Sequence, residues 1–234
     1  TLLNNDLWVG ITFALRPAPF PNTTLNIIRP TGTAENDVMV ASIGFRTGCC
    51  SSSTDIGITA PAGWTPVSGL GGVFNTRLDN PTDTRNGLAV YYKVAGTSGS
   101  DPGPYAWTFS CTGNCIAIGF QAAAGGIASF SGVDTANPID RQEGRYTAAL
   151  DQRTPSVTTT VANTMLVASH SYATATTATW TQNSGMNPTG VDIVAVSQST
   201  LMSYVLQAAA TATGAKQATP TPDDDQGNAH SLAG

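Results

Sequence analysis

The sequence predicts an all-β protein made of short antiparallel strands. Short segments alternate between apolar and polar residues and are rich in β-branched and aromatic side chains. Turn signals such as Pro61-Ala62-Gly63, Asn86-Gly87 and Pro102-Gly103-Pro104 separate these segments. Charged residues make up only 11% of the 234 residues, which is too few for the exposed faces of a helical bundle. Strands at this spacing are typical of a β-sandwich or a β-barrel.

The strongest alternation lies at the beginning of the chain. One face of this segment is wholly apolar and carries Leu7, Val9, Ile11, Phe13 and Leu15. The opposite face carries Trp8, Gly10, Thr12, Ala14 and Arg16. A strand with such a one-sided pattern must be buried against a sheet, because alternation places all its apolar side chains on one face. We therefore assign residues 1–16 as an N-terminal strand of the donor type.

A proline-rich connector follows over residues 17–24. Pro17, Pro19 and Pro21 alternate with other residues, which favours a stiff and extended polyproline-like conformation. We expect the remaining residues, 25–234, to form a single β-sandwich domain.

Within this domain, alternation predicts strands over 38–45, 88–94, 166–172, 191–196 and 201–206. The segment VMVASIGF from Val38 parallels MLVASHSY from Met165, and each is followed by a tryptophan and an aromatic-bearing strand. This echo favours two similar halves, although sandwich strands also resemble one another through shared constraints. The expected core anchors are Trp64, Trp180, Tyr92 and Tyr204.

The C-terminal end contrasts with the N-terminal one. No strongly apolar closing strand follows the acidic turn Asp223-Asp224-Asp225, so one end carries a surplus strand and the other lacks one. The three carboxylates offer hard oxygen ligands for calcium. However, the turn lacks the alternation that points successive carboxylates inward, which favours a solvated loop.

The four cysteines form two close pairs, Cys49 with Cys50 and Cys111 with Cys115. Because a ring between neighbouring cysteines is strained, we favour two bridges that join the two loops. A local bond between Cys111 and Cys115 remains open, since four cysteines allow three connectivities. An even, clustered cysteine count predicts an oxidising compartment and hence a secreted, extracellular or cell-surface location.

Composition and motifs exclude several classes of function. The net charge of −5 and the absence of a basic cluster argue against nucleic acid and anionic membranes as partners. No segment reads as a membrane span, since the most apolar stretch, 116–133, is interrupted by polar residues and is mostly Ala and Gly. His170 and His230 are isolated, and Asp134 and Asp140 fit turn caps. We therefore expect no enzyme, metal or cofactor.

Several motifs resemble those of a known family. They are PAGWTPV from Pro61, YYKVAG from Tyr91, YAWTF from Tyr105, FSGVDTANPID from Phe130 and SVTTTVANTMLVAS from Ser156. In this order they are similar to jelly-roll-like β-sandwich domains of secreted bacterial surface proteins and phage tail-associated proteins, over most of residues 25–214. The resemblance implies a jelly-roll-like antiparallel β-sandwich. Members of this family usually end in an apolar strand, whereas this chain carries such a strand, WVGITFALRP, at residues 8–17.

The displaced strand allows two arrangements. It can return to its own domain, which gives a circularly permuted monomer, or it can fill the edge of the next subunit. We favour the second arrangement, whose head-to-tail contact does not close and therefore builds a homopolymer. The expected function is thus a structural subunit of an extracellular, pilus-like filament. The alternative is a secreted or tail-associated adhesion module that binds surface or matrix glycans through Trp8, Trp64, Trp107 and Trp180.

Overall fold

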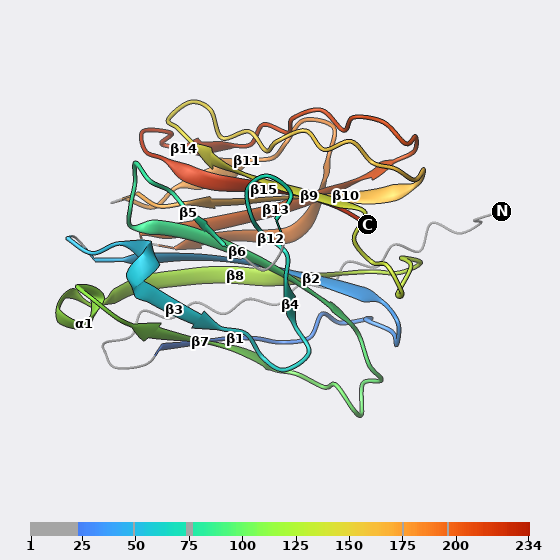
Figure 1. Cartoon of the computed structure of the whole chain (residues 1–234), viewed down its shortest axis with the longest axis horizontal. Helices are drawn as coiled ribbons and strands as arrows, with labels where there is room; N and C mark the ends of the chain where they lie inside the picture. The colour runs from blue at the N-terminus through green and yellow to red at the C-terminus, as the bar shows by residue number, and fades with distance from the viewer. Residues whose placement is uncertain (1–22, 49, 74–76, 175, 196) are drawn as a thin grey trace.

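A computed structural model of the chain describes residues 23–234, apart from 49, 74–76, 175 and 196. The N-terminal strand, with Leu7, Val9, Ile11, Phe13 and Leu15, and the connector prolines lie outside the described residues. The predicted all-β fold is confirmed, since the described chain consists of antiparallel strands with only short helical turns at Ser53–Asp55 (η1) and Cys115–Ile118 (α1). Figure 1 shows these strands as stacked layers.

Two five-stranded sheets form the middle of the stack. The first-half sheet has the order β4-β6-β2-β8, and β5 also pairs with β6. Its strands are β2 (Val38–Thr47), β4 (Thr65–Pro66), β5 (Leu78–Asp79), β6 (Asn86–Val94) and β8 (Phe120–Phe130). The second-half sheet has the order β12-β13-β10-β15-β9. Its strands are β9 (Arg141–Thr147), β10 (Thr164–Tyr172), β12 (Asn187–Ala195), β13 (Gln198–Gln207) and β15 (Gly227–Ala233).

Smaller layers cover the outer faces of both sheets. The first outer layer has the order β1-β7-β3, formed by β1 (Thr23–Ile27), β7 (Tyr105–Cys111) and β3 (Ile56–Thr59). The second outer layer pairs β11 (Thr179–Thr181) with β14 (Thr219–Thr221). The described chain therefore contains four layers, with the two large sheets facing each other (Figure 1).

Strand β2 shows how the layers create two cores. Met39 and Phe45 belong to the apolar cluster beneath the first outer layer, which also contains Trp107. Val40 belongs to the cluster between the two large sheets, together with Val167 of β10. Every residue of β2 is buried, because alternation sends neighbouring side chains into different cores.

The two halves of the chain share one strand topology. Strand β2 lies between β6 and β8, just as β10 lies between β13 and β15. The contacts across the middle are reciprocal, since β6 packs against β15 and β13 packs against β8. The echoing segments from Val38 and Met165 are the central strands β2 and β10. The similarity of the halves therefore extends from sequence to strand pairing.

The expected absence of a C-terminal closing strand is wrong. Strand β15 follows the acidic turn, pairs with both β10 and β9, and is buried along its whole length. Its sequence, GNAHSLA, carries a single large apolar residue, Leu232, and so gives no hydrophobic alternation. In the described part of the chain it is the first half that is one strand short, because β8 pairs only with β2.

Small residues in β8 allow the layers to approach closely. A Cβ atom at Gly126 would lie 2.6 Å from a side-chain carbon of Val191 in β12, and one at Gly125 would lie 2.6 Å from Ile43. Real Cβ atoms do not approach neighbours so closely, so the two glycines are required by packing.

We predict that Gly126→Ala destabilises the protein by about 1–3 kcal/mol, because the methyl group overpacks the contact with Val191. Urea unfolding followed by tryptophan fluorescence measures the change. Gly99→Ala is the matched control, since a Cβ there meets nothing within 4 Å, and it should leave the stability almost unchanged. Equal stabilities for the two variants would contradict the packing account.

Candidate functional site

The outer edge of β8 is the candidate functional site. With 11 residues, FQAAAGGIASF, β8 is the longest described strand and carries no charge and no proline. In the described chain it is hydrogen-bonded on one side only. An edge strand presents a row of N–H and C=O groups that can pair with another chain, and charges or prolines normally prevent this. Sequence reasoning missed this site, although the uncharged stretch 116–133 was its signal.

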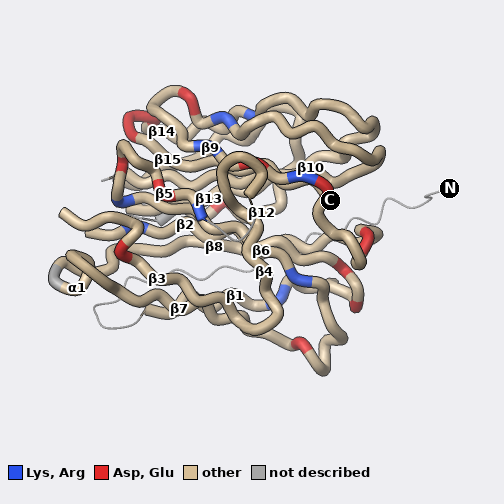
Figure 2. Tube along the Cα trace, viewed as in Figure 1, with Lys and Arg blue, Asp and Glu red and all other residues tan. Residues whose placement is uncertain are grey.

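Other edges of the two large sheets are protected. Strand β9 carries Arg141, Glu143 and Arg145, whereas β12 contains Pro188 and an irregular register before Asp192. The opposite edge of the first-half sheet consists of the two-residue strands β4 and β5. Figure 2 shows that the charges lie mainly at loops and strand ends and that β8 is uncharged along its length. Among these edges, β8 is therefore the one suited to accept a strand.

A strand beside β8 would meet both cores. Ala123 and Ile127 of β8 belong to the cluster beneath the first outer layer, whereas Ala124 and Ala128 belong to the cluster between the large sheets. Strands β1 and β12 pack against β8 from its two faces. An added strand would thus find an apolar surface on each side.

The disulfide between Cys111 and Cys115 holds the beginning of β8. It joins the end of β7 to α1, which leads directly into β8. The favoured bridges between the two loops are therefore wrong for these cysteines, and the local alternative is correct. The four-residue spacing allows this bond because the turn over residues 112–114 brings the two Cα atoms to 5.1 Å. Cys50 is exposed, and Cys49 lies outside the described residues.

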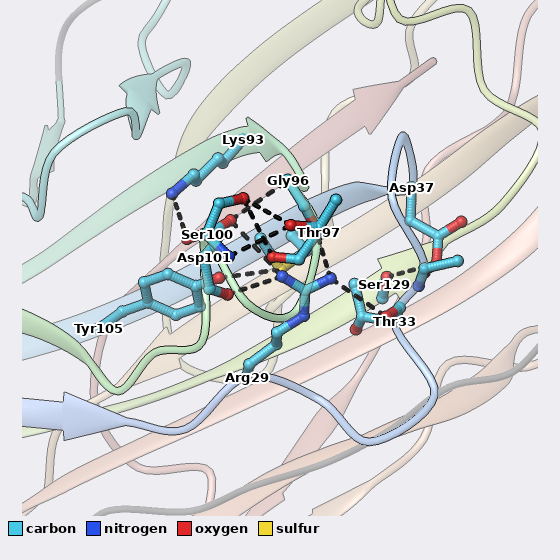
Figure 3. A network of polar contacts seen from close by, with 12 residues as sticks. Arg29, Thr33, Asp37, Lys93, Gly96, Thr97, Ser100, Asp101, Tyr105 and Ser129 are labelled. Atoms are coloured by element: carbon cyan, nitrogen blue, oxygen red, sulfur yellow. Dashed lines mark hydrogen bonds and ion pairs between the residues drawn. The ribbon is translucent and has the colours of Figure 1, made fainter.

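A cluster of polar contacts around Asp101, called the clamp below, lies near the other end of β8 (Figure 3). Asp101, between β6 and β7, accepts a hydrogen bond of 2.6 Å from Lys93 and lies 3.7 Å from the guanidinium of Arg29. Arg29 also donates to the backbone carbonyls of Asp101 and Gly96, at 2.7 and 2.9 Å. Burial alone would raise the pKa of Asp101, but hydrogen bonds from Lys93 and Gly96 outweigh it and lower that pKa.

The clamp region continues to β8 itself. Ser129 of β8 donates a hydrogen bond of 3.3 Å to Asp37, which also accepts one of 2.8 Å from the backbone of Ala34. Figure 3 shows Asp37 and Ser129 beside the Arg29 cluster. The disulfide before β8 and the Ser129–Asp37 hydrogen bond therefore tie both ends of β8 to neighbouring segments of the same chain.

The aromatic residues predicted as core anchors lie in several cores. Trp64 is only 7% exposed and packs edge-on against Tyr105 and Trp107, at ring-centroid distances of 5.1 and 5.2 Å. Tyr92 and Tyr204 are half-buried against the cluster between the large sheets. Trp180 of β11 is half-buried and packs against His170 and Tyr172. Trp107 is fully buried, so neither Trp64 nor Trp107 offers a face to a sugar.

The candidate carboxylates have structural partners. Asp134 accepts a backbone hydrogen bond from Ala136 at 2.9 Å, as in a turn cap, and Asp140 accepts one from the backbone of Thr160 at 2.7 Å. In the acidic turn, Asp224 accepts a hydrogen bond of 3.0 Å from the Tyr172 hydroxyl. Within residues 23–234 as described, no group of three His, Cys, Asp or Glu side chains is arranged for a metal.

Two shallow grooves lie away from the β8 edge. One, of about 660 Å³, is lined by Ile58, Pro66, Arg77 and Tyr91. The other, of about 460 Å³, is lined by Ser52, Asp55, Arg85 and Asn114. Both are open to solvent, and their polar contacts join neighbouring segments, as Arg77 does when it donates to the backbone carbonyl of Ser53 at 2.8 Å.

Comparison of the chain with family models, curated proteins and solved structures finds no match. The described part of the chain contains no helix that is long and apolar enough to span a membrane.

We predict that Asp101→Asn destabilises the protein by about 2 kcal/mol, because it removes the charge that Lys93 and Arg29 share. Denaturant unfolding at pH 7 measures the loss. Glu35→Gln, an exposed substitution in the loop that contains Thr33, is the control and should change stability by less than about 0.5 kcal/mol. A loss no larger than that of the control would refute the clamp.

The two buried histidines predict a dependence of stability on pH. Burial lowers the pKa of His170 to about 4 and that of His230 to about 3. Below about pH 6.5 the two histidines of the unfolded chain therefore bind protons, whereas those of the folded chain stay neutral. The free energy of unfolding should lose nothing to the histidines above this pH. Between about pH 6 and 5 it should fall by roughly 1.4 kcal/mol per pH unit for each histidine.

Urea unfolding at several pH values measures this slope. The double variant His170→Gln and His230→Gln should show a clearly flatter slope, whatever its stability at pH 7. An unchanged slope in the double variant would show that other groups cause the acid sensitivity.

Proposed function

We propose that the protein is a structural subunit of an extracellular, pilus-like filament. In this proposal residues 7–15 of one copy insert beside β8 of the next copy, and repetition of this contact builds a head-to-tail homopolymer. The role is structural and not catalytic. The observation that carries the proposal is the long, uncharged edge of β8, which pairs on one side only in the described chain.

The character of the N-terminal segment supports the proposal. Its five alternating apolar residues need a buried sheet edge, and the first-half sheet offers such an edge next to two apolar cores. The prolines at 17, 19 and 21 favour an extended connector, which suits a segment that leaves its own subunit.

Other features of the molecule are compatible with an extracellular location. The Cys111–Cys115 disulfide is typical of an oxidising compartment. Few charges lie on the strands (Figure 2), so copies repel each other weakly at close contact. We also propose that the domain of residues 25–234 follows the jelly-roll-like arrangement of the family that its motifs resemble. Pairing between strands distant in the chain, such as β1 with β7 and β2 with β8, supports this.

The glycan-binding alternative has weaker support. It depended on exposed tryptophans, but Trp64 and Trp107 are buried in the first core. Trp180 is half-buried against Tyr172, and Trp8 lies outside the described residues. We therefore retain it only as the second candidate.

We predict that deletion of residues 1–16 abolishes filaments, because the β8 edge then has no strand to accept. Negative-stain electron microscopy of the purified protein measures this. Ile11→Asp with Phe13→Asp should have the same effect, since it places two charges on the apolar face. Asn5→Asp, which lies outside the alternating segment, is the matched control and should still polymerise.

A peptide of residues 1–16 should bind the truncated protein in a one-to-one complex and keep it soluble. The same peptide with aspartate at positions 11 and 13 should not bind. Filaments formed by the truncated protein would exclude donor-strand assembly.

A further inference from the structure

The two halves of the chain differ most clearly beside β8. In the second-half sheet, β15 lies between β10 and the edge strand β9. In the first-half sheet, β8 takes the place of β15 beside the central strand β2. The described residues contain no strand in the place that corresponds to β9. The second half therefore provides an internal template for the missing strand.

Strand registers relate the two sheets residue by residue. The echoing segments end at Phe45 in β2 and at Tyr172 in β10. Phe45 is opposite Ala123 of β8, and Tyr172 is opposite Gly227 of β15. Ala123 therefore corresponds to Gly227, whose partner in β9 is Thr147.

The order of segments along the chain identifies the counterpart of β9. Residues 148–156 lead from Thr147 to the buried Val157, which precedes a bridge between Thr158 and Ala212. Residues 16–24 lead from Leu15 to the buried Leu25 of β1 through a connector of equal length. Position 15 thus corresponds to position 147.

We propose that residues 7–15 pair with β8 in the antiparallel direction, with Leu15 opposite Ala123, Phe13 opposite Gly125 and Ile11 opposite Ile127. This is the register of β9 on β15, transferred to the first half. The inference rests on the proposed function for the source of the strand, which is a neighbouring copy.

The register places each face of the segment against a suitable surface. Residues opposite each other on antiparallel strands share a face, so Leu15 and Ile11 point toward the core that contains Ala123 and Ile127. Phe13 then lies opposite Gly125, where an aromatic ring covers a position without a side chain. A slip by one residue would instead turn Arg16 and Trp8 toward this core, which opposes any such slip.

The other face of the segment carries small residues where little space is left between the layers. In this register Thr12 lies opposite Gly126, where Val191 of β12 leaves no room for a Cβ atom. Gly10 and Ala14 flank this position. Small residues on this face therefore fit beneath β12, whereas the bulky face fits beneath the first outer layer.

Cysteine cross-linking tests the register. Ala14→Cys combined with Ala124→Cys places two cysteines directly opposite each other, and both substitutions add a single atom. Ala14→Cys with Ala128→Cys is the matched control, because four residues along a strand separate the pair by about 13 Å, beyond the reach of a disulfide. After mild oxidation, peptide mass mapping distinguishes the new bridge from those of the native cysteines.

We expect at least tenfold more of the 14–124 bridge than of the 14–128 bridge, in a ladder of covalent oligomers on non-reducing gels. Mixing the two single variants should also give 14–124 dimers. A 14–124 bridge confined to monomers would uphold the register but overturn the filament proposal. Filaments without a 14–124 bridge would overturn the register and leave the filament proposal standing. Neither bridge nor filaments would overturn both.

Discussion

Burial of the first-half sheet on both faces is the constraint on which the rest of the structure depends. Every residue of β2 is buried, because one face meets the first outer layer and the other meets the second-half sheet. A charge in such a position has a large desolvation cost, and the one charge of β2, Arg46 near the end of the strand, donates hydrogen bonds to the backbone carbonyls of Thr174 and Ser197. This explains why only 11% of the chain is charged and why the charges gather at loops and strand ends.

Burial of both faces also leaves the edges as the only places where another strand can reach this sheet. A sheet covered on both faces is accessible only along its edges, and β8 lacks the charges that protect β9. The Cys111–Cys115 bond lies just before this edge, and the hydrogen bond from Ser129 to Asp37 ties its other end. A rigid acceptor edge reduces the ordering cost of strand addition, because only the incoming strand loses conformational freedom.

The sequence predicted strands whose two faces differ in size or polarity, such as 38–45 and 201–206, which the structure extends to Val38–Thr47 and Gln198–Gln207. It did not predict β8 and β15, because close layers select Gly, Ala and Ser on both faces and thereby remove the alternation. The candidate site belongs to this second group, so its signal was the lack of charge. The cysteine pairing depends on the turn at α1, a local geometry that the spacing alone left open.

A comparison of the two connectors bears on whether the N-terminal strand stays in its own subunit. The connector of the second half folds back locally, since Ala148 forms a bridge with Asp151 and Arg153 forms one with Gln217. Such bridges use backbone N–H groups, which Pro17, Pro19 and Pro21 lack. The N-terminal connector has the same length but favours an extended path of about 3.1 Å per residue. The two halves therefore differ at the connector: β15 pairs on both sides, with β10 and β9, whereas β8 pairs only with β2 among the described strands. In the proposed filament, the local connector closes the second half on itself, and the extended connector directs the first-half strand to a neighbouring copy.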